Sequence, residues 1–492
     1  MKKRGFKDSR IQGVQCPSLE SSNHRPPDPF RSQGARVLVV GMGRSGTSVA
    51  RFLLRAGAKV IGSDENPAAL GSRQVAQLRR AGMTTTRQPE SARVDWAVVS
   101  PGVGSNHPLI RALRRRSVPI VDELDLASRL LSASPVGQHV GGPIIAITGT
   151  NGKSTTTALI AQMLENAGKR VFCGGNLAPG RPLSAALMAG PKDYYVVEAS
   201  SFQLERARWL KPKVAVILNI TADHLNRHGT VGRYADCKSR ILDRQSPDDY
   251  AVLNQDDPKV YAARCRGKGE KHFFSMRLRS ADAHLADGII WTGDQAVLPV
   301  RQVRLPGTHN IQNCLAATAA VRLLGVGLAP IRRALKAFNG LPHRLENVRR
   351  LGGVDYINSS MTTNPAAGAM SIEAIAAGRA AKGARRGARV VLIAGGREKA
   401  LPTIEYARAM RKYAKWVLLI GESSIRLARE LDSLGFRRYD VLADLKTAVA
   451  AARAKARAGD AVLFAPGFAS FDQFRDFEAR GEAFRREVNN LD

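Results

Sequence analysis

Residues 143–157 read Pro143-Ile144-Ile145-Ala146-Ile147-Thr148-Gly149-Thr150-Asn151-Gly152-Lys153-Ser154-Thr155-Thr156-Thr157. An apolar run rich in β-branched residues leads into a glycine-containing turn, and Ala and Leu then recur at helical spacing as far as Leu164. Strand, loop and helix in this order are typical of a phosphate-binding loop, in which backbone N–H groups and a helix N-terminus face phosphate oxygens. The segment therefore predicts a nucleotide-binding α/β domain rather than an ordinary glycine turn.

Each residue of this loop has an expected part in binding ATP. Lys153 would reach the β- and γ-phosphates, and the hydroxyl of Ser154 or Thr155 would face Mg²⁺. The common phosphate loop has a glycine five residues before its Gly-Lys pair, and Ile147 stands there. The loop is the shorter Gly-Thr-Asn-Gly-Lys-Ser-Thr form. Its expected ATP-binding residues are Gly149, Thr150, Asn151, Gly152, Lys153, Ser154 and Thr155.

Length and composition indicate a multidomain protein of the cytoplasm. The chain has 492 residues and 44% hydrophobic residues, which favours two to four ordinary globular domains. No apolar run is long enough for a membrane span, and Met1-Lys2-Lys3-Arg4-Gly5 is not followed by the apolar core of a signal peptide. Five scattered cysteines without a Cys-x-x-Cys pair suggest reduced thiols.

The formal net charge of +33 allows two interpretations. One is nucleic-acid binding, and the other is a set of solvated, arginine-rich helix faces. The excess arginines are spread along the chain and no nucleic-acid-binding module is recognisable, so we favour the second and expect no nucleic-acid partner. A basic surface still attracts small anionic substrates.

The N-terminal part predicts a Rossmann-like unit preceded by a disordered basic extension. Residues 1–34 lack periodicity. A strand at 36–40 runs into Gly41-Met-Gly-Arg-Ser-Gly46, and a second strand at 59–63 ends at Asp64. This pattern fits a dinucleotide-binding turn without specifying the nucleotide. A third strand, 95–99, ends in Ser100-Pro101-Gly102, and the segment 132–142 is expected to be a linker.

Two further α/β units follow. Strands are expected at 170–173, 194–198 and 214–218, with a weaker β region at 271–305. Beyond a break near 340–346, strands are expected at 355–358, 389–394, 416–420 and 461–465. Alternation of strands and helices predicts mostly parallel sheets. The predicted fold is thus α/β, with an extension at 1–34 and three domains at 35–138, 139–341 and 342–492.

Spacing alone identifies few catalytic groups. Glu198, directly after an apolar strand, is the best carboxylate candidate for Mg²⁺. His224 could be a ligand or a hydrogen-bonded structural histidine, and Asp223 a ligand or a helix cap. Lys238 looks like an ordinary helix lysine.

Several motifs together resemble those of the Mur ligase family. They include Gly149-Thr-Asn-Gly-Lys-Ser-Thr155, Glu198-Ala-Ser-Ser-Phe-Gln-Leu-Glu205, Asn219-Ile-Thr-Ala-Asp-His-Leu225, Leu305-Pro-Gly-Thr-His-Asn310 and Leu341-Pro-His-Arg-Leu-Glu346. They occur in family order and spacing, and the resemblance extends over nearly everything from residue 36 onward. The Ser-Ser-Phe-Gln-Leu-Glu form and the run Pro466–Phe474 point to the branch that adds D-glutamate to UDP-N-acetylmuramoyl-L-alanine.

The resemblance implies a monomeric ATP-dependent ligase and roles for individual residues. A carbamylated Lys238 would join Ser154, Glu198 and His224 as ligands of two Mg²⁺ ions, and Lys153, Lys238 and His224 would serve catalysis. Asn310, Asn313 and Arg344 would face the adenine nucleotide. The UDP substrate would be bound by Gly43, Arg44, Ser45, Asp64, Gly102, Asn176 and Ser200, which leaves a redox NAD site as the runner-up for the N-terminal domain. Glutamate would be bound by Lys399, Ser470 and Phe477.

The chain departs from the family pattern where the C-terminal domain begins. The stretch Asn358-Ser-Ser-Met-Thr-Thr-Asn-Pro365 has Ser359 in place of the family's aspartate and Met361 in place of its lysine. Arg397 could replace that lysine. These changes leave open an L-glutamate-adding ligase or another member of the superfamily, and a non-catalytic nucleotide- or nucleic-acid-binding relative.

Overall fold

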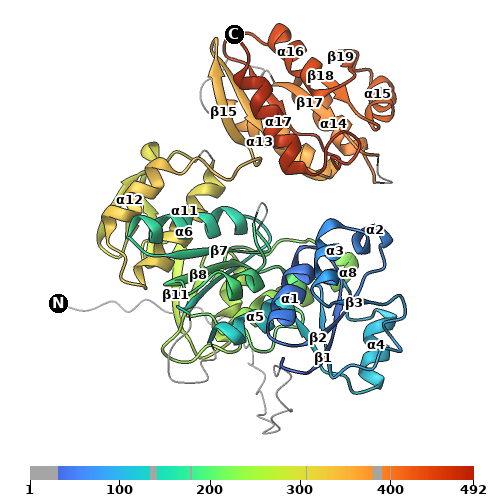
Figure 1. Cartoon of the computed structure of the whole chain (residues 1–492). Coiled ribbons are helices and arrows are strands. Elements are labelled where there is room, and N and C mark those ends of the chain that lie inside the picture. The colour runs from blue at the N-terminus through green and yellow to red at the C-terminus, as the bar shows by residue number, and fades with distance from the viewer. Residues whose placement is uncertain (1–31, 133–140, 178–179, 306, 381–389, 399–400) are drawn as a thin grey trace, which may run out of the picture.

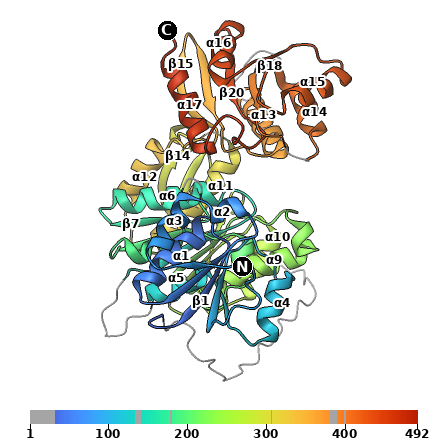
Figure 2. The ribbon, with the colours of Figure 1, turned by 45° about the vertical axis from the view of Figure 1, so that its right-hand side comes forward.

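Three sheets organise the chain, each with helices on its faces. This computed structural model describes residues 32–132, 141–177, 180–305, 307–380, 390–398 and 401–492. The predicted extension up to residue 31, the linker residues 133–140 and Lys399 lie outside the described residues. Figures 1 and 2 show the first two units in contact, with the third above them. The α/β class with mostly parallel sheets is confirmed.

The first unit is a five-stranded parallel sheet in the order β3-β2-β1-β4-β5. Its central strands begin and end close to the predicted positions because their apolar residues are buried on both faces. The elements are β1 Arg36–Val40, α1 Arg44–Arg55, β2 Lys59–Ser63, α2 Pro67–Leu70, α3 Arg73–Arg80, β3 Thr84–Thr85, β4 Trp96–Val99, α4 Pro108–Arg115 and β5 Ile120–Asp122.

The second unit is a nine-stranded sheet in the order β14-β13-β12-β11-β10-β9-β6-β8-β7, in which β6 (Ile144–Thr148) is third from one edge. The strands β8 and β7 lie on one side of β6, and β9, β10 and β11 lie on the other, all parallel. Chain order therefore reverses beside β6, and the carboxyl ends of β6, β8 and β9 meet there, which is where open α/β sheets bind ligands. The strands are β7 Val171–Gly175, β8 Tyr194–Glu198, β9 Val214–Ile217, β10 Tyr250–Asn254, β11 Glu270–Ser275, β12 Ala283–Ala286, β13 Ile289–Thr292 and β14 Gln295–Pro299.

Helices cover both faces of this sheet, and α6 and α11 pack against each other (Figure 1). The α-helices are α6 Lys153–Asn166, α7 Ser201–Leu204, α8 Leu225–His228, α9 Val231–Ser239, α10 Pro258–Ala262, α11 Thr308–Arg322 and α12 Leu328–Ala337; short 3₁₀ helices lie at Leu183–Met188, Arg240–Leu242, Ala263–Cys265 and Val300–Gln302. The strand β10 was absent from the prediction.

The third unit is a six-stranded sheet in the order β15-β16-β20-β17-β18-β19. It is parallel except for the β15–β16 hairpin. Its elements are β15 Glu346–Leu351, β16 Val354–Asn358, α13 Pro365–Ala380, β17 Val390–Gly395, α14 Ile404–Tyr413, β18 Ala414–Ile420, α15 Ser424–Ser433, β19 Tyr439–Val441, α16 Leu445–Lys455, β20 Ala461–Phe464 and α17 Phe477–Asn489.

The helix α5 (Glu123–Ser132) joins the first two units. Leu126 belongs to the core of the first unit, whereas Leu124 and Leu131 pack into a core of the second. The Glu123 carboxylate accepts a hydrogen bond from the Ser184 N–H at 2.6 Å. One helix therefore supplies apolar contacts to both units and a polar contact to the second.

Among the helices of the described residues, none combines the length and the apolar character needed to cross a membrane.

Candidate active site

The phosphate loop lies at the carboxyl end of β6 and is held from β9. Thr150 N donates to Asn219 O at 2.8 Å, and the Asn219 side chain bonds both the N–H and the C=O of Asn151, at 2.8 and 3.0 Å. Gly152 has a φ of 83°, and a Cβ there would lie 2.2 Å from the Asn313 Oδ1. Only glycine fits this left-handed, crowded position, after which α6 begins at Lys153. Hydrogen bonds from Asn219 and the close approach of Asn313 thus hold the loop in place.

Lys153 stands at the first position of α6. Its Nζ donates to the Thr150 carbonyl at 2.8 Å, which folds the side chain back over the loop. Burial lowers the pKa of Lys153; the Glu198 carboxylate opposes that shift, and the nearby Arg344 adds to it. The position is the one expected of a phosphate-binding lysine.

Ser154, Glu198 and Asn176 form a polar cluster beside the loop. Ser154 Oγ donates to one Glu198 carboxylate oxygen at 2.5 Å, and Asn176 Nδ2 donates to the other at 2.9 Å. Glu198 ends β8 and is only 2% exposed. The sequence assigned Ser154 and Glu198 to Mg²⁺ and Asn176 to the UDP substrate, and the structure brings the three side chains together. Thr155, half-buried, follows in the first turn of α6.

Lys238 lies on α9 and is 1% exposed. Its Nζ donates to the Gly149 carbonyl at 2.7 Å and lies 4.5 Å from the ring centre of Tyr234. Burial, and after it the charge of Lys153, lower the pKa of Lys238 to about 7. This lysine, which spacing alone assigned to an ordinary helix face, is buried beneath the phosphate loop.

His224 lies at the start of α8 with a φ of 51°, a conformation uncommon for a residue other than glycine. Its side chain is 48% exposed, and its ring packs against Phe202 at a centroid distance of 4.8 Å. Asp223 accepts a hydrogen bond from the His224 N–H at 2.8 Å. Among the described residues there is no group of three or more His, Cys, Asp or Glu that could hold a metal ion.

The residues expected to face adenine lie on α11 and on the chain that leads to the third unit. Asn313 Nδ2 donates to Asn310 Oδ1 at 3.1 Å, so these side chains share one face of α11, against Gly152. Arg344 lies near enough to affect the pKa of Lys153. It stands between His343 and Leu345, which both have positive φ, at 62° and 47°. The backbone is therefore constrained around Arg344.

The predicted UDP-binding residues of the first unit lie at the carboxyl ends of β1, β2 and β4. The Asp64 carboxylate bonds the backbone of two loops: one oxygen accepts from Met42 N, in the turn after β1, at 2.6 Å, and the other accepts from Asn66 N, in its own loop, at 2.8 Å. Arg44 Nη1 reaches the Gly180 carbonyl of the second unit at 3.3 Å. Gly43 precedes α1 as its N-cap. The remaining predicted residues here are Ser45, at the start of α1, and Gly102, in the loop after β4.

The Ser200 side chain caps the N-terminus of the short helix α7. Its hydroxyl accepts from Gln203 N at 3.3 Å, and the Gln203 side chain bonds the Ser200 N–H in return at 3.0 Å. This capping box begins the short helix α7.

The predicted glutamate-binding residues lie in the third unit. Ser470 is buried in the loop after β20, and Phe477 begins α17. Arg397 N donates to Ala469 O at 2.8 Å, so the loops after β17 and β20 adjoin. The described residues bring Ser470 and Arg397 to one edge of the third sheet.

Sequence reasoning assigned no role to Arg480, Arg206 or Arg227. Arg480 is 2% exposed and donates to the carbonyls of Ser360 and Phe468 at 2.9 and 3.0 Å, which ties two loops of the third unit. Arg206 and Arg227 contact the loop after β4. No local signal distinguishes these three among the 75 lysines and arginines of the chain.

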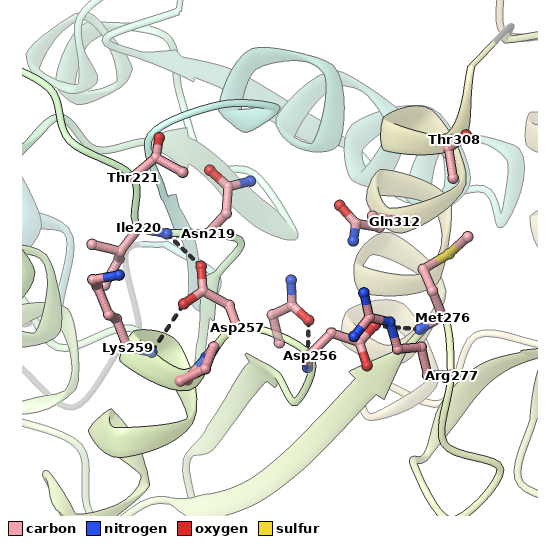
Figure 3. A pocket seen from close by; sticks show the side chains of 12 residues that line it. Asn219, Ile220, Thr221, Asp256, Asp257, Lys259, Met276, Arg277, Thr308 and Gln312 are labelled. Atoms are coloured by element: carbon pink, nitrogen blue, oxygen red, sulfur yellow. Dashed lines mark hydrogen bonds between the residues drawn. The ribbon is translucent and has the colours of Figure 1, made fainter.

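A pocket of about 490 Å³ lies at the carboxyl ends of β9, β10 and β11 (Figure 3). Its aspartates serve local structure: Asp257 accepts from Ile220 N at 2.8 Å, and Asp256 accepts from Met276 N at 2.6 Å. None of the predicted site residues lines it. Asn219, which holds the phosphate loop, also lines this pocket, so the pocket adjoins the candidate active site at that loop.

Three family models match the chain in succession. They are "Mur ligase MurD-like, N-terminal domain" at residues 35–122, "Mur ligase middle domain" at 147–321 and "Mur ligase, glutamate ligase domain" at 343–468.

Curated relatives and solved structures agree with these models. The UDP-N-acetylmuramoylalanine--D-glutamate ligase of Pelotomaculum thermopropionicum is 38% identical over 471 residues, and that of Geobacter metallireducens is 39% identical over 472; each match covers 93% of this chain and 98% of the relative. The MurF ligase from Thermotoga maritima shares the fold, with a TM-score of 0.54 at 18% identity over 94% of this chain and 99% of that one. The chain belongs to the Mur ligase family.

Proposed function

We propose that this chain is an ATP-dependent ligase that adds D-glutamate to UDP-N-acetylmuramoyl-L-alanine. The observation that carries this conclusion is the match, at 34–39% identity over 93% of the chain, to relatives named for that reaction. The substrates are ATP, UDP-N-acetylmuramoyl-L-alanine and glutamate. The L-glutamate-adding alternative is not favoured by these relatives. We further propose a monomer that works in the cytoplasm without a nucleic-acid partner.

We propose that each unit binds one substrate. Residues 35–138 would hold the uridine nucleotide through Gly43, Arg44, Ser45, Asp64 and Gly102. Residues 139–341 would hold ATP on the phosphate loop, with Asn176 and Ser200 toward the muramoyl group. Residues 342–492 would hold glutamate, with Ser470 and Phe477 in contact with it.

The residues around Glu198 fit Mg²⁺. Mg²⁺ prefers oxygen ligands and binds through one or two carboxylates together with substrate phosphates. Glu198 is a buried carboxylate whose nearest donor is the Ser154 hydroxyl, at 2.5 Å beside the loop. We propose Ser154 and Glu198 as ligands, with His224 and a carbamylated Lys238 completing two sites. Bound Mg²⁺ would neutralise charge on the transferring phosphoryl group.

Burial favours carbamylation of Lys238. Only the neutral amine attacks CO₂, and a buried lysine is neutral more readily than an exposed one. Carbamylation replaces an ammonium with an anionic oxygen donor, which removes the repulsion between Lys238 and Lys153 that their proximity creates.

The chemistry proposed has two steps. The carboxylate of UDP-N-acetylmuramoyl-L-alanine attacks the γ-phosphorus of ATP, ADP leaves, and Lys153 stabilises the developing charge. The amine of glutamate then attacks the carbonyl carbon of the acyl phosphate, phosphate leaves, and the nitrogen loses a proton as the amide forms. The enzyme's main contribution is to position the three substrates and to exclude water from the acyl phosphate.

Phosphate release tests the proposal. Purified protein is mixed with ATP, Mg²⁺ and UDP-N-acetylmuramoyl-L-alanine, and D-glutamate is compared with L-glutamate. We expect release with D-glutamate and no release above background with L-glutamate. Release with L-glutamate alone would reassign the amino acid, and release with neither would refute the ligase.

A further inference from the structure

The loop after β4 turns its carbonyl groups toward two arginines of the second unit. Arg206 donates to Val103 O at 2.7 Å and to Ser100 O at 3.1 Å. Arg227 donates to Pro101 O at 3.0 Å and, at 3.4 and 3.5 Å, to the carbonyls of Gly102 and Val103. Four consecutive carbonyls of the first unit are thus bound by guanidinium groups of the second. The position of this loop is set from outside its own unit.

The Arg227 guanidinium is itself held by Glu205. Arg227 Nε donates to Glu205 Oε2 at 2.8 Å, and both side chains are less than one-fifth exposed. The other Glu205 oxygen accepts from the hydroxyl of Ser105, in the same loop. Arg240 Nη1 donates to the Glu205 carbonyl at 2.6 Å, which fixes the backbone there. Glu205 therefore bonds both Arg227 and the loop that Arg227 binds.

The Phe202 ring lies between Arg227 and His224, the histidine proposed as a metal ligand. The guanidinium lies 4.4 Å from the ring centre of Phe202, and that ring packs against His224 at 4.8 Å. Arg227 belongs to α8, the short helix that His224 begins, which lies beside the first unit in Figure 1. Contacts thus run without a break from the loop at 100–105, through Arg227 and Phe202, to His224.

We propose that Arg227 is a positioning residue that sets the sugar-nucleotide loop of the first unit relative to His224. This inference rests on the proposed function, because it assigns the loop to the UDP substrate and His224 to the metal. Arginine suits the role because its planar fork bonds several carbonyls while its face stacks on an aromatic ring. Lysine keeps the charge but lacks both the fork and the stacking face.

The test compares Arg227→Lys with Arg233→Gln, an exposed arginine on the neighbouring helix α9. For Arg227→Lys we expect the KM for UDP-N-acetylmuramoyl-L-alanine to rise roughly tenfold, with a parallel rise in the Mg²⁺ concentration for half-maximal rate. The KM for glutamate, which binds in the third unit, stays unchanged, as does Tm. Arg233→Gln changes none of these. A purely structural role would lower Tm and the active fraction but leave both KM values alone.

Amide hydrogen exchange gives a readout that does not depend on turnover. In Arg227→Lys without ligands, exchange should speed up at residues 100–105 and 221–225 and stay unchanged in the third unit. Unchanged exchange and an unchanged sugar-nucleotide KM would overturn the inference. If the unmodified protein shows no ligase activity while exchange still speeds up at both segments, the proposed function fails and the positioning contact stands.

Discussion

At the scale of single residues, the loss of two family charges at the third unit needs an explanation. Ser359 is buried and hydrogen-bonds Leu345 N and Ser371 at 3.4 Å, so a serine fits its present surroundings. Met361 is half-buried and offers glutamate no charge. Arg397, 54% exposed, forms a loose ion pair with Glu422 within the described part of the chain, at 3.4 Å between Nε and Oε2. Its guanidinium is therefore available at the same edge as Ser470.

We predict that Arg397→Ala raises the KM for D-glutamate about tenfold, because a charged hydrogen bond to a carboxylate is lost. In a Met361→Lys background, Arg397→Ala should raise the KM for D-glutamate less than about threefold, because the restored lysine binds the same carboxylate. Steady-state kinetics on the four proteins measure the coupling, with Arg408→Ala on the surface of α14 as the control. An equal increase in the KM for D-glutamate in both backgrounds would show that positions 361 and 397 act on different groups.

At the scale of elements, the sequence predicts most strands that are buried on both faces and misses a partly exposed one. Strands such as β1, β2 and β8 lie where expected, because parallel strands buried on both faces read as apolar runs. The strand β15 was missed because its sequence, Glu-Asn-Val-Arg-Arg-Leu, is mostly polar. It is a strand because it pairs with β16, and a local pattern does not reveal that pairing. The cluster of Ser154 and Glu198 was predictable, because Glu198 ends one strongly patterned strand and Ser154 belongs to the loop-and-helix motif that follows another. Arg227 was not, because its role depends on a loop more than one hundred residues away.

The helix α5 places buried carboxylates between the first two units. Asp125 accepts three backbone N–H groups, from Arg208, Trp209 and Leu210, at 2.6 to 2.9 Å. Glu123 is 1% exposed; one of its oxygens bonds Ser184 N, and the other has no hydrogen-bond partner among the residues that the structure describes. Burial raises the pKa of Glu123. The interface thus contains a carboxyl group that destabilises the folded protein when it is ionised, relative to its protonated form.

We predict that Glu123→Gln makes thermal stability less dependent on pH. Because the folded pKa of Glu123 exceeds the unfolded one, the native state binds more protons, and its stability falls as pH rises through the folded pKa. Glutamine can keep the hydrogen bond to Ser184 and buries no charge. The Tm of the variant minus that of the unmodified protein should therefore increase from pH 5 to pH 8 in calorimetry. Glu165→Gln, on the exposed face of α6, should give a constant difference; a constant difference for Glu123→Gln too would contradict the argument.

At the scale of the whole molecule, the residues predicted to bind ATP and glutamate lie in different units, so the proposed reaction requires these units to approach each other. The phosphate loop lies at the edge of the second sheet and Ser470 in the third unit, which Figures 1 and 2 show above the other two. His343 is fixed in the third unit, where its carbonyl accepts from Met361 N at 3.0 Å and its ring lies against Gly481. The next residue, Arg344, lies near Lys153. This dipeptide thus connects the third unit to the phosphate loop.

We predict that Arg344 couples ATP binding to the approach of the third unit. An anionic nucleotide beside Lys153 attracts the Arg344 guanidinium, and the anchored His343 moves the third unit with it. We expect ATP to decrease the radius of gyration of the unmodified protein in small-angle X-ray scattering. Arg344→Ala should abolish this decrease and should raise the KM for ATP roughly tenfold. Arg350→Ala, on the exposed strand β15, should leave both quantities unchanged. If Arg344→Ala weakens ATP binding but the protein still contracts at saturating ATP, Arg344 serves the nucleotide alone, and another contact must bring glutamate to the acyl phosphate.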